Sequence, residues 1–284
     1  MTAASIVVGY DGSIEAREAV DWAAVEAARS ATPLLIVYAY QFAWPSAHYE
    51  GDSAVIAVEA EERAERTVGE VVEHVRKHHP GVSVTGTSVH AAPAPTLLDL
   101  TEYSRLLVVG NRGAGGMANL LLGSVSQQVA THARGPMAVV RGRATATDGP
   151  VVVGVDGSPS TDAALTLAFE AAAARGTELI AIRAFAPPSP VVVPLSAVEA
   201  AEREALESSL GGWRERYPDV KLETLLARGR PARVLVEASH TAQLVVVGSR
   251  GHGGFAGLLL GSVGQHLMHH AECPILIAHQ PQAA

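Results

Sequence analysis

The chain has 284 residues, which at roughly 150 residues per domain corresponds to about two domains. Apolar residues make up 48% of it and charged residues 18%, a balance that is typical of a folded globular protein and excludes a mainly disordered chain. The net charge of −8 disfavours nucleic acid and anionic lipid as partners, because binding to either needs clustered basic residues.

Neither a membrane span nor an oxidising compartment is indicated. No apolar run approaches the ~18 to 20 residues that a spanning helix requires, and the first twelve residues have no basic head. The single cysteine, Cys273, cannot form an internal disulfide or a multi-cysteine zinc site. We therefore expect a cytoplasmic protein without a membrane span.

The sequence repeats itself once. Residues 6–13 reappear as 151–158 at an offset of 145, and residues 108–125 reappear as 246–263 at an offset of 138. A repeat of this length indicates a duplicated domain. We predict domains at 1–143 and 148–281, a linker within 142–150, and a loss of seven residues from the second copy, most simply in the loop after its second strand.

Strands and helices are predicted to alternate in both copies. Apolar runs of strand length lie at residues 5–10, 34–40, 82–89, 106–110 and 137–141, and again at 151–155, 179–185, 220–226, 244–248 and 275–278. Helices are predicted after the first strand of each copy, at 54–79, 96–104, 197–217 and 233–240, and after the glycine-rich loop of each copy. This alternation predicts a doubly wound α/β fold with a parallel sheet.

The first helix of each copy has recognisable ends. Ser13 and Ser158 are suitable N-cap residues, Pro159 suits a first helical position, and Gly176 suits a helix end. Ligands of doubly wound sheets bind at the carboxyl ends of the strands, where the strand order reverses. That rule directs attention to Asp11, after the first strand, and to Gly110, at the end of the fourth.

Each copy carries the spacing Gly-x2-Gly-x9-Gly-Ser between its fourth strand and the next helix. Glycine lets a ligand approach the backbone closely, and the N-terminus of a helix favours phosphate. Two copies in the same register predict a phosphate site in each half. A P-loop is excluded because Lys77 and Lys221 lie far from both loops, and a dinucleotide fingerprint fails because Asp11 and Ile14 occupy its glycine positions.

The strand followed by Asp-Gly-Ser and the glycine spacing resemble the universal stress protein family, over nearly the whole chain and as a tandem member of its ATP-binding branch. The resemblance implies two tandem doubly wound five-stranded parallel sheets, of the Rossmann-like, adenine nucleotide alpha hydrolase-like type, related by a pseudo-two-fold axis. It also implies ATP with Mg²⁺ as ligands, last strands that pair with each other, a homodimer and a role in stress adaptation.

Carried over position by position, the resemblance implies a set of nucleotide-binding residues. Asp11 and Asp156 match the aspartate after the first strand, although each could instead cap the neighbouring helix or turn. Backbone groups of Ala39 and Ala184 match the adenine position. The phosphate and ribose positions are Gly110, Gly113, Gly123, Ser124, Val125 and Ser126 in the first copy and Gly248, Gly251, Gly261, Ser262 and Val263 in the second. Arg112 and Arg250 are either surface groups or approach phosphate.

The two copies differ around these positions. After its third strand the second copy has Arg-Gly-Arg-Pro at 228–231, resembling the family's Gly-x-Pro, whereas the first has His-Ala-Ala-Pro at 90–93. The first copy has Ser126 where the second has Gly264. We expect the two sites to differ in nucleotide affinity, and these differences do not rank them.

Three functions are compatible with these features. The leading hypothesis is an ATP-binding stress-response or signalling module whose conformation or partner affinity depends on occupancy. Neither loop contains a lysine, a catalytic histidine or a nucleophile with an evident base, so at most slow hydrolysis is expected. The alternatives are a slow ATPase or adenylyl-type transferase that uses the same sites, and a structural scaffold in which the loops are plain turns.

Overall fold

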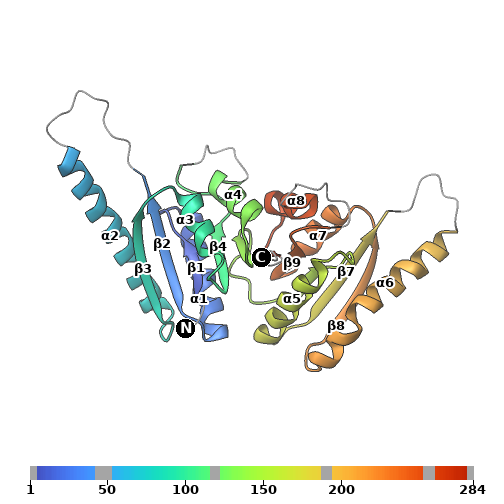
Figure 1. Ribbon diagram of the computed structural model, residues 1–284. Coiled ribbons are helices and arrows are strands. Elements are labelled where there is room, and N and C mark those ends of the chain that lie inside the picture. The colour runs from blue at the N-terminus through green and yellow to red at the C-terminus, as the bar shows by residue number, and fades with distance from the viewer. Residues whose placement is uncertain (1–4, 42–52, 116–121, 187–193, 252–259, 280–284) are drawn as a thin grey trace. The chain divides into compact units, whose positions relative to one another are not determined.

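The computed structural model describes residues 5–41, 53–115, 122–186, 194–251 and 260–279 (Figure 1). The chain divides into two compact units, residues 1–129 and 130–284. In each unit helices lie on both faces of a sheet (Figure 1). The predicted α/β fold class is therefore confirmed.

Unit 1 contains a parallel sheet with the strand order β3-β2-β1-β4. Its strands are β1 (Ile6–Gly9), β2 (Leu34–Tyr40), β3 (Val84–His90) and β4 (Leu106–Gly110). Its helices are α1 (Ile14–Ser30), α2 (Ser53–His78), α3 (Pro93–Leu100) and the start of α4 (Ser124–His132). The strand order reverses between β1 and β4, as a doubly wound fold requires.

Unit 2 has the strand order β5-β10-β9-β6-β7-β8. Its strands are β5 (Met137–Val140), β6 (Val151–Gly154), β7 (Leu179–Phe185), β8 (Leu222–Arg228), β9 (Leu244–Gly248) and β10 (Ile275–Ala278). Its helices are α5 (Thr161–Arg175), α6 (Leu195–Arg216), α7 (Pro231–Ser239) and α8 (Ser262–His270). The five strands of the second repeat are parallel, and the order reverses between β6 and β9.

The last strands of the two repeats pair with each other, as the family resemblance implied. β5 and β10 are antiparallel, with Ala138 opposite Leu276. Both strands are buried throughout. This pairing explains why β5, although it belongs to the first repeat, is grouped with unit 2. The domain limits 1–143 and 148–281 follow the sequence repeat and stay a prediction.

Most predicted strands agree with the structure, and the bounds of β2, β4, β7, β9 and β10 agree to the residue. Helices α3 and α7 begin two or three residues earlier than predicted, at Pro93 and Pro231. Proline is accommodated in the first turn because its missing N–H has no partner there. The second copy is seven residues shorter between its second and third strands, as predicted, but the loss is not confined to the loop: α6 has 22 residues against 26 in α2, so four of the seven come from the helix.

The ends of the first helices show one confirmed and one wrong prediction. Ser13 caps α1, and its hydroxyl accepts a hydrogen bond from the N–H of Ala16 at 3.1 Å. Ser158 is not the N-cap of α5, because its hydroxyl instead contacts the carbonyl of Arg250 at 3.2 Å and the helix begins only at Thr161. Pro159 is accordingly outside the helix.

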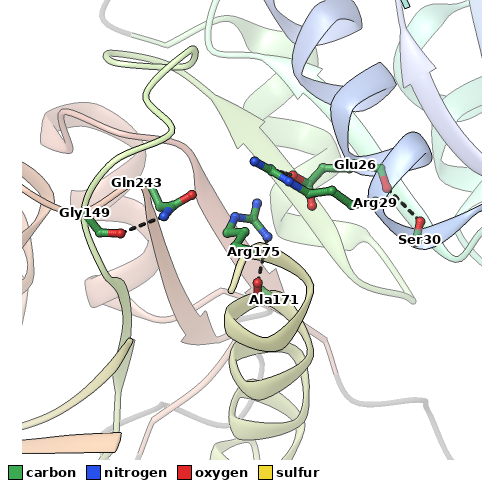
Figure 2. Close-up of polar contacts among 7 residues, drawn as sticks. All are labelled: Glu26, Arg29, Ser30, Gly149, Ala171, Arg175 and Gln243. Atoms are coloured by element: carbon green, nitrogen blue, oxygen red, sulfur yellow. Dashed lines mark hydrogen bonds and ion pairs between the residues drawn. The ribbon is translucent and has the colours of Figure 1, made fainter. Parts of the chain in front are cut away.

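The C-terminal ends of α1 and α5 adopt the same left-handed conformation with different residues. Gly176 ends α5 with φ of 61°, as predicted, whereas Ala31 ends α1 with φ of 48°. Ala31 is the one non-glycine residue with positive φ in the described ranges. The last turn of α1 is held by Glu26, whose carbonyl accepts from the Ser30 hydroxyl at 2.7 Å (Figure 2).

The predicted linker is packed against unit 2. The carbonyl of Gly149 accepts hydrogen bonds from Nε2 of Gln243 at 2.7 Å (Figure 2) and from the hydroxyl of Thr177 at 3.0 Å. Arg143 Nη2 donates to the carbonyl of Ala242 at 2.8 Å. Among the helices in the described ranges, none is both long and apolar enough to cross a bilayer.

Candidate functional site

Asp11 lies at the carboxyl edge of unit 1, between the ends of β1 and β4. Its Oδ1 accepts hydrogen bonds from the N–H and the hydroxyl of Ser13, at 3.0 and 2.6 Å. Its Oδ2 accepts one from the N–H of Ala114 at 2.8 Å. The carboxylate therefore caps the turn before α1, the alternative that the sequence left open, and also holds the glycine-rich loop after β4.

Asp156 occupies the corresponding place after β6. Its Oδ1 accepts hydrogen bonds from the N–H of Ser158 and the hydroxyl of Thr161, both at 2.9 Å. A Cβ atom built on Gly251 would lie 2.6 Å from Asp156 Oδ2, so this carboxylate also contacts its loop. The structure thus brings together the predicted aspartate and glycine-rich loop in both copies.

Helix packing explains the first glycine of each loop. Gly110 and Gly248 are the last residues of β4 and β9. A Cβ atom on Gly110 would lie 2.8 Å from the carbonyl oxygen of Glu15, and one on Gly248 would overlap the hydroxyl of Ser160. A side chain at either position would displace the start of α1 or α5 from the strand end. These glycines are therefore required without any ligand.

The aspartate contact explains the second glycine of each loop. A Cβ atom on Gly113 would overlap Oδ2 of Asp11, and one on Gly251 would lie within 2.6 Å of Oδ2 of Asp156. Neither glycine has a positive φ. Close approach to the carboxylate, not backbone conformation, is therefore what excludes a side chain at these positions.

The third glycine of each loop has no such explanation among the described residues. The nearest atoms to a Cβ atom on Gly123 and on Gly261 lie at 3.4 and 3.5 Å, which is ordinary van der Waals contact or close to it. Gly261 has φ of −70° and ψ of 158°, a conformation open to any residue, and Gly123 has no positive φ. The described protein atoms leave space beside both glycines.

Both of these glycines directly precede a helix. The N–H of Gly123 donates to the carbonyl of Asn111 at 2.8 Å, and that of Gly261 donates to Ser249 at 2.7 Å, which fixes each helix start against its strand end. The first helical residues, Ser124 and Ser262, are exposed. N–H groups in a first helical turn have no partner within the helix, so those at each junction can donate to a ligand.

The predicted residues that follow these two serines are less exposed to solvent. Val125 and Val263 are half-buried. Ser126 is buried, and its hydroxyl donates to the carbonyl of Gly110 at 2.7 Å, so it fastens α4 to the end of β4. Gly264 stands at the equivalent place in α8.

Ala39 and Ala184 lie near the ends of β2 and β7. The last β1–β2 pair is Gly9 with Val37, and the N–H of Tyr10 donates to the carbonyl of Val37. Successive residues of a parallel strand bond to opposite neighbours, so Ala39, two residues after Val37, faces the same side as Val37, beyond the last residue pair of β1. The contact of Val155 with Ile182 places Ala184 in the same way in unit 2.

The two loop arginines have different surroundings. Arg112 Nη2 lies 2.7 Å from Oε1 of Glu15, an ion pair that joins the loop to the first turn of α1. Arg250 is exposed, and its carbonyl oxygen accepts hydrogen bonds from the hydroxyls of Ser158 and Ser160. Glu15 and Ser160 are not among the residues predicted from the sequence, although the offset of 145 aligns them.

The side chains in the described part of the chain do not by themselves form a metal site. In the ranges that the structure describes, no three histidine, cysteine, aspartate or glutamate side chains are placed to hold an ion. His266 and His270 lie one turn apart on α8, with ring centroids 4.4 Å apart, and no third ligand joins them there.

Together, the fold and the paired loops define a tandem doubly wound α/β protein with a glycine-rich strand-to-helix junction at the carboxyl edge of each repeat. The model of the universal stress protein family matches residues 3–141 and 149–279. Universal stress protein Rv2005c of Mycobacterium tuberculosis is 38% identical over 293 residues, covering 97% of both chains. The chain belongs to the universal stress protein family.

Other relatives agree with this assignment. A universal stress protein of Mycolicibacterium smegmatis is 36% identical over 281 residues, covering 96% of both chains. The crystal structure of a universal stress protein from Archaeoglobus fulgidus superposes with a TM-score of 0.74 at 17% identity, over 99% of this chain and 100% of that one. The latter likeness concerns the fold.

Proposed function

We propose that each repeat binds one ATP molecule at the junction between its glycine-rich loop and the following helix. The observation that carries this proposal is the pair Gly123 and Gly261, where described protein contacts leave a Cβ atom room and do not require glycine. A ligand that approaches the backbone closely supplies the missing reason. The free N–H groups of the following turn suit a phosphate there.

The remaining predicted residues fit around such a ligand. The exposed hydroxyls of Ser124 and Ser262 stand beside the helix N-termini and can donate to phosphate oxygens. Backbone groups of Ala39 and Ala184, past the ends of β1 and β6, offer donors and acceptors to the edge of an adenine ring. A nucleotide in this pose would lie along the carboxyl edge of its own sheet, where doubly wound folds bind their ligands.

We include Mg²⁺ as a companion of ATP. Magnesium usually keeps several waters and is held by substrate phosphates with one or two carboxylates. The Asp11 carboxylate contacts the backbone of the loop of the first copy, and both of its oxygens already accept hydrogen bonds from the protein. We therefore assign the ion mainly to phosphate oxygens and water, with Asp11 and Asp156 as anchors of the loops.

The proposed role is that of an ATP-dependent regulator in the stress response. Asp11 accepts hydrogen bonds from both the loop after β4 and the turn before α1. Asp156 accepts one from the turn before α5 and lies against its own loop at Gly251. Nucleotide binding to the loop therefore acts on the position of that turn as well. The contacts of the two aspartates hold the loop and the turn in position. A homodimer and a cytoplasmic location complete the proposal, and sedimentation equilibrium measures the former.

Calorimetric titration of the full chain with ATP and Mg²⁺ tests the binding proposal. We expect two sites in the unaltered chain. Gly123→Ala is expected to weaken ATP binding at the first site, and Gly261→Ala at the second, by about ten-fold or more in Kd. Gly69→Ala is the matched control, because Gly69 is exposed on α2 with no atom near its Cβ position. ATP binding that is absent from the unaltered chain, or unchanged in both loop variants, contradicts the proposal.

A further inference from the structure

The residue at the third position after the aspartate-glycine pair differs in charge between the two copies. Glu15 occupies it in the first copy and Ser160 in the second, at the offset of 145 that relates the first strands and helices. Both residues lie directly against the first glycine of their own loop: the carbonyl of Glu15 against Gly110 and the hydroxyl of Ser160 against Gly248. The two residues therefore hold equivalent positions in the chain, each against the first glycine of its own loop, although Glu15 makes this contact through its backbone and Ser160 through its hydroxyl.

In the first copy this residue neutralises the loop arginine. Oε1 of Glu15 lies 2.7 Å from Nη2 of Arg112. The side chains are 24% and 42% exposed, so the pair stands at the surface and can exchange partners. For Arg112 to meet a phosphate it must leave this carboxylate or share it, and a negative charge stays beside the ligand in either case.

In the second copy the equivalent residue has no charge and forms no ion pair with the loop arginine. Ser160 is 3% exposed, and its hydroxyl donates to the carbonyl of Arg250, so it contacts the arginine backbone and not its guanidinium. Within the described residues no carboxylate forms an ion pair with Arg250. The segments of unit 2 outside those ranges, residues 187–193, 252–259 and 280–284, contain no acidic side chain.

The other charged residues near the helix starts do not offset this difference by direct contact. Arg17 donates a hydrogen bond from Nη2 to the hydroxyl oxygen of Tyr10 at 3.0 Å. Its counterpart Asp162 is exposed in the first turn of α5 and forms no ion pair with Arg250. The positive charge of Arg250 is felt by His279: burial is the main cause that lowers the pKa of His279, and the charge of Arg250 lowers it further.

We propose that Glu15 weakens the first site for phosphate-bearing nucleotides, so that the second site binds ATP more tightly and fills first. This inference rests on the proposed function and ranks the two sites, which the sequence alone does not. Exposed ion pairs are weak, so removing the charge of Glu15 is expected to tighten binding at the first site by roughly two- to five-fold.

The test uses full-length chains in which a single site remains. Gly261→Ala leaves the first site, and Gly123→Ala leaves the second. Adding Glu15→Gln to the Gly261→Ala chain is expected to lower the Kd for ATP by about two- to five-fold. The same substitution in the Gly123→Ala chain is expected to leave the Kd unchanged. Circular dichroism verifies that each variant is folded.

Two controls separate the ion pair from net charge. Glu18→Gln removes the same charge from an exposed position one turn further along α1, and is expected to change the Kd less than Glu15→Gln does. Arg112→Gln is expected to abolish most of the gain from Glu15→Gln, because the two residues act as a pair. Equal effects of both glutamate substitutions would show that only net charge matters and would overturn the role of Glu15.

The outcomes distinguish this inference from the function on which it rests. If ATP binds but Glu15→Gln has no effect, or the first site is the tighter one, the ranking is overturned and ATP binding stands. If the unaltered chain binds no ATP, the proposed function is itself overturned, and the ranking with it.

Discussion

The contact between Asp11 and Gly113 makes a specific prediction about stability. In Gly113→Ala the new Cβ atom would overlap Oδ2 of Asp11, the oxygen that accepts from the N–H of Ala114 at 2.8 Å. The carboxylate or the loop must move, and that hydrogen bond is broken or lengthened. The proposed ATP ligand is not involved, so the effect belongs to the free protein.

The expected magnitude follows from that one hydrogen bond. A bond to a charged acceptor contributes about 1.5 to 3 kcal/mol, and water replaces part of it at this partly exposed position. We therefore expect Gly113→Ala to lower the free energy of unfolding by about 1 to 2 kcal/mol. For a domain of this size that corresponds to a fall in Tm of roughly 2 to 8 °C. Gly123→Ala, whose Cβ atom has room, should stay within about 0.5 kcal/mol of the unaltered chain.

Urea unfolding of four chains measures the coupling: the unaltered chain, Gly113→Ala, Asp11→Ala and the double variant. With the carboxylate removed, the added methyl group should cost less than about 0.5 kcal/mol, which leaves a coupling energy near 1 kcal/mol. Strictly additive effects of the two substitutions would refute the argument that Gly113 is glycine because of Asp11.

Three further predictions concern positions away from the loops. Ala31→Gly should raise the free energy of unfolding by about 0.5 to 1 kcal/mol in urea unfolding, because the residue has a φ of 48° where α5 has Gly176; no gain would contradict the left-handed end of α1. Burial lowers the pKa of His279 to about 4, so unfolding takes up a proton between pH 6.5 and 4. The free energy of unfolding should therefore fall, as the pH is lowered through this range, by up to about 1.4 kcal/mol per pH unit. The fall should be smaller in His279→Gln. Burial raises the pKa of the Cys273 thiol to about 12, so a thiol reagent at pH 8 should label it only in denaturant, and rapid labelling of the folded chain would disagree with its burial.

The strands were the most predictable part of the fold. Near-continuous apolar runs such as those of β4 and β9 are short, bounded by turn residues and buried, so their bounds follow from the sequence alone. Helix starts were less predictable where proline or serine had two possible roles. Ser158 has the composition of an N-cap, but the carbonyl that its hydroxyl contacts belongs to Arg250, 92 residues away.

The candidate site shows the same limit. Glycine spacing located both loops, because it reports where backbone is approached closely. It did not tell what approaches it: at Gly110 the neighbour is the carbonyl of Glu15, at Gly113 the carboxylate of Asp11, and at Gly123 no described atom is that near. These contacts bring together residues about a hundred positions apart and depend on how α1 packs on β4, which a motif does not encode.

A crystal structure of the chain grown with ATP and Mg²⁺ tests the central claim most directly. We predict phosphate density at the first turns of α4 and α8, within contact distance of Gly123 and Gly261, with adenine near Ala39 and Ala184. Density for ATP elsewhere, or two junctions without nucleotide at saturating ATP, would contradict the assignment of these loops as nucleotide sites.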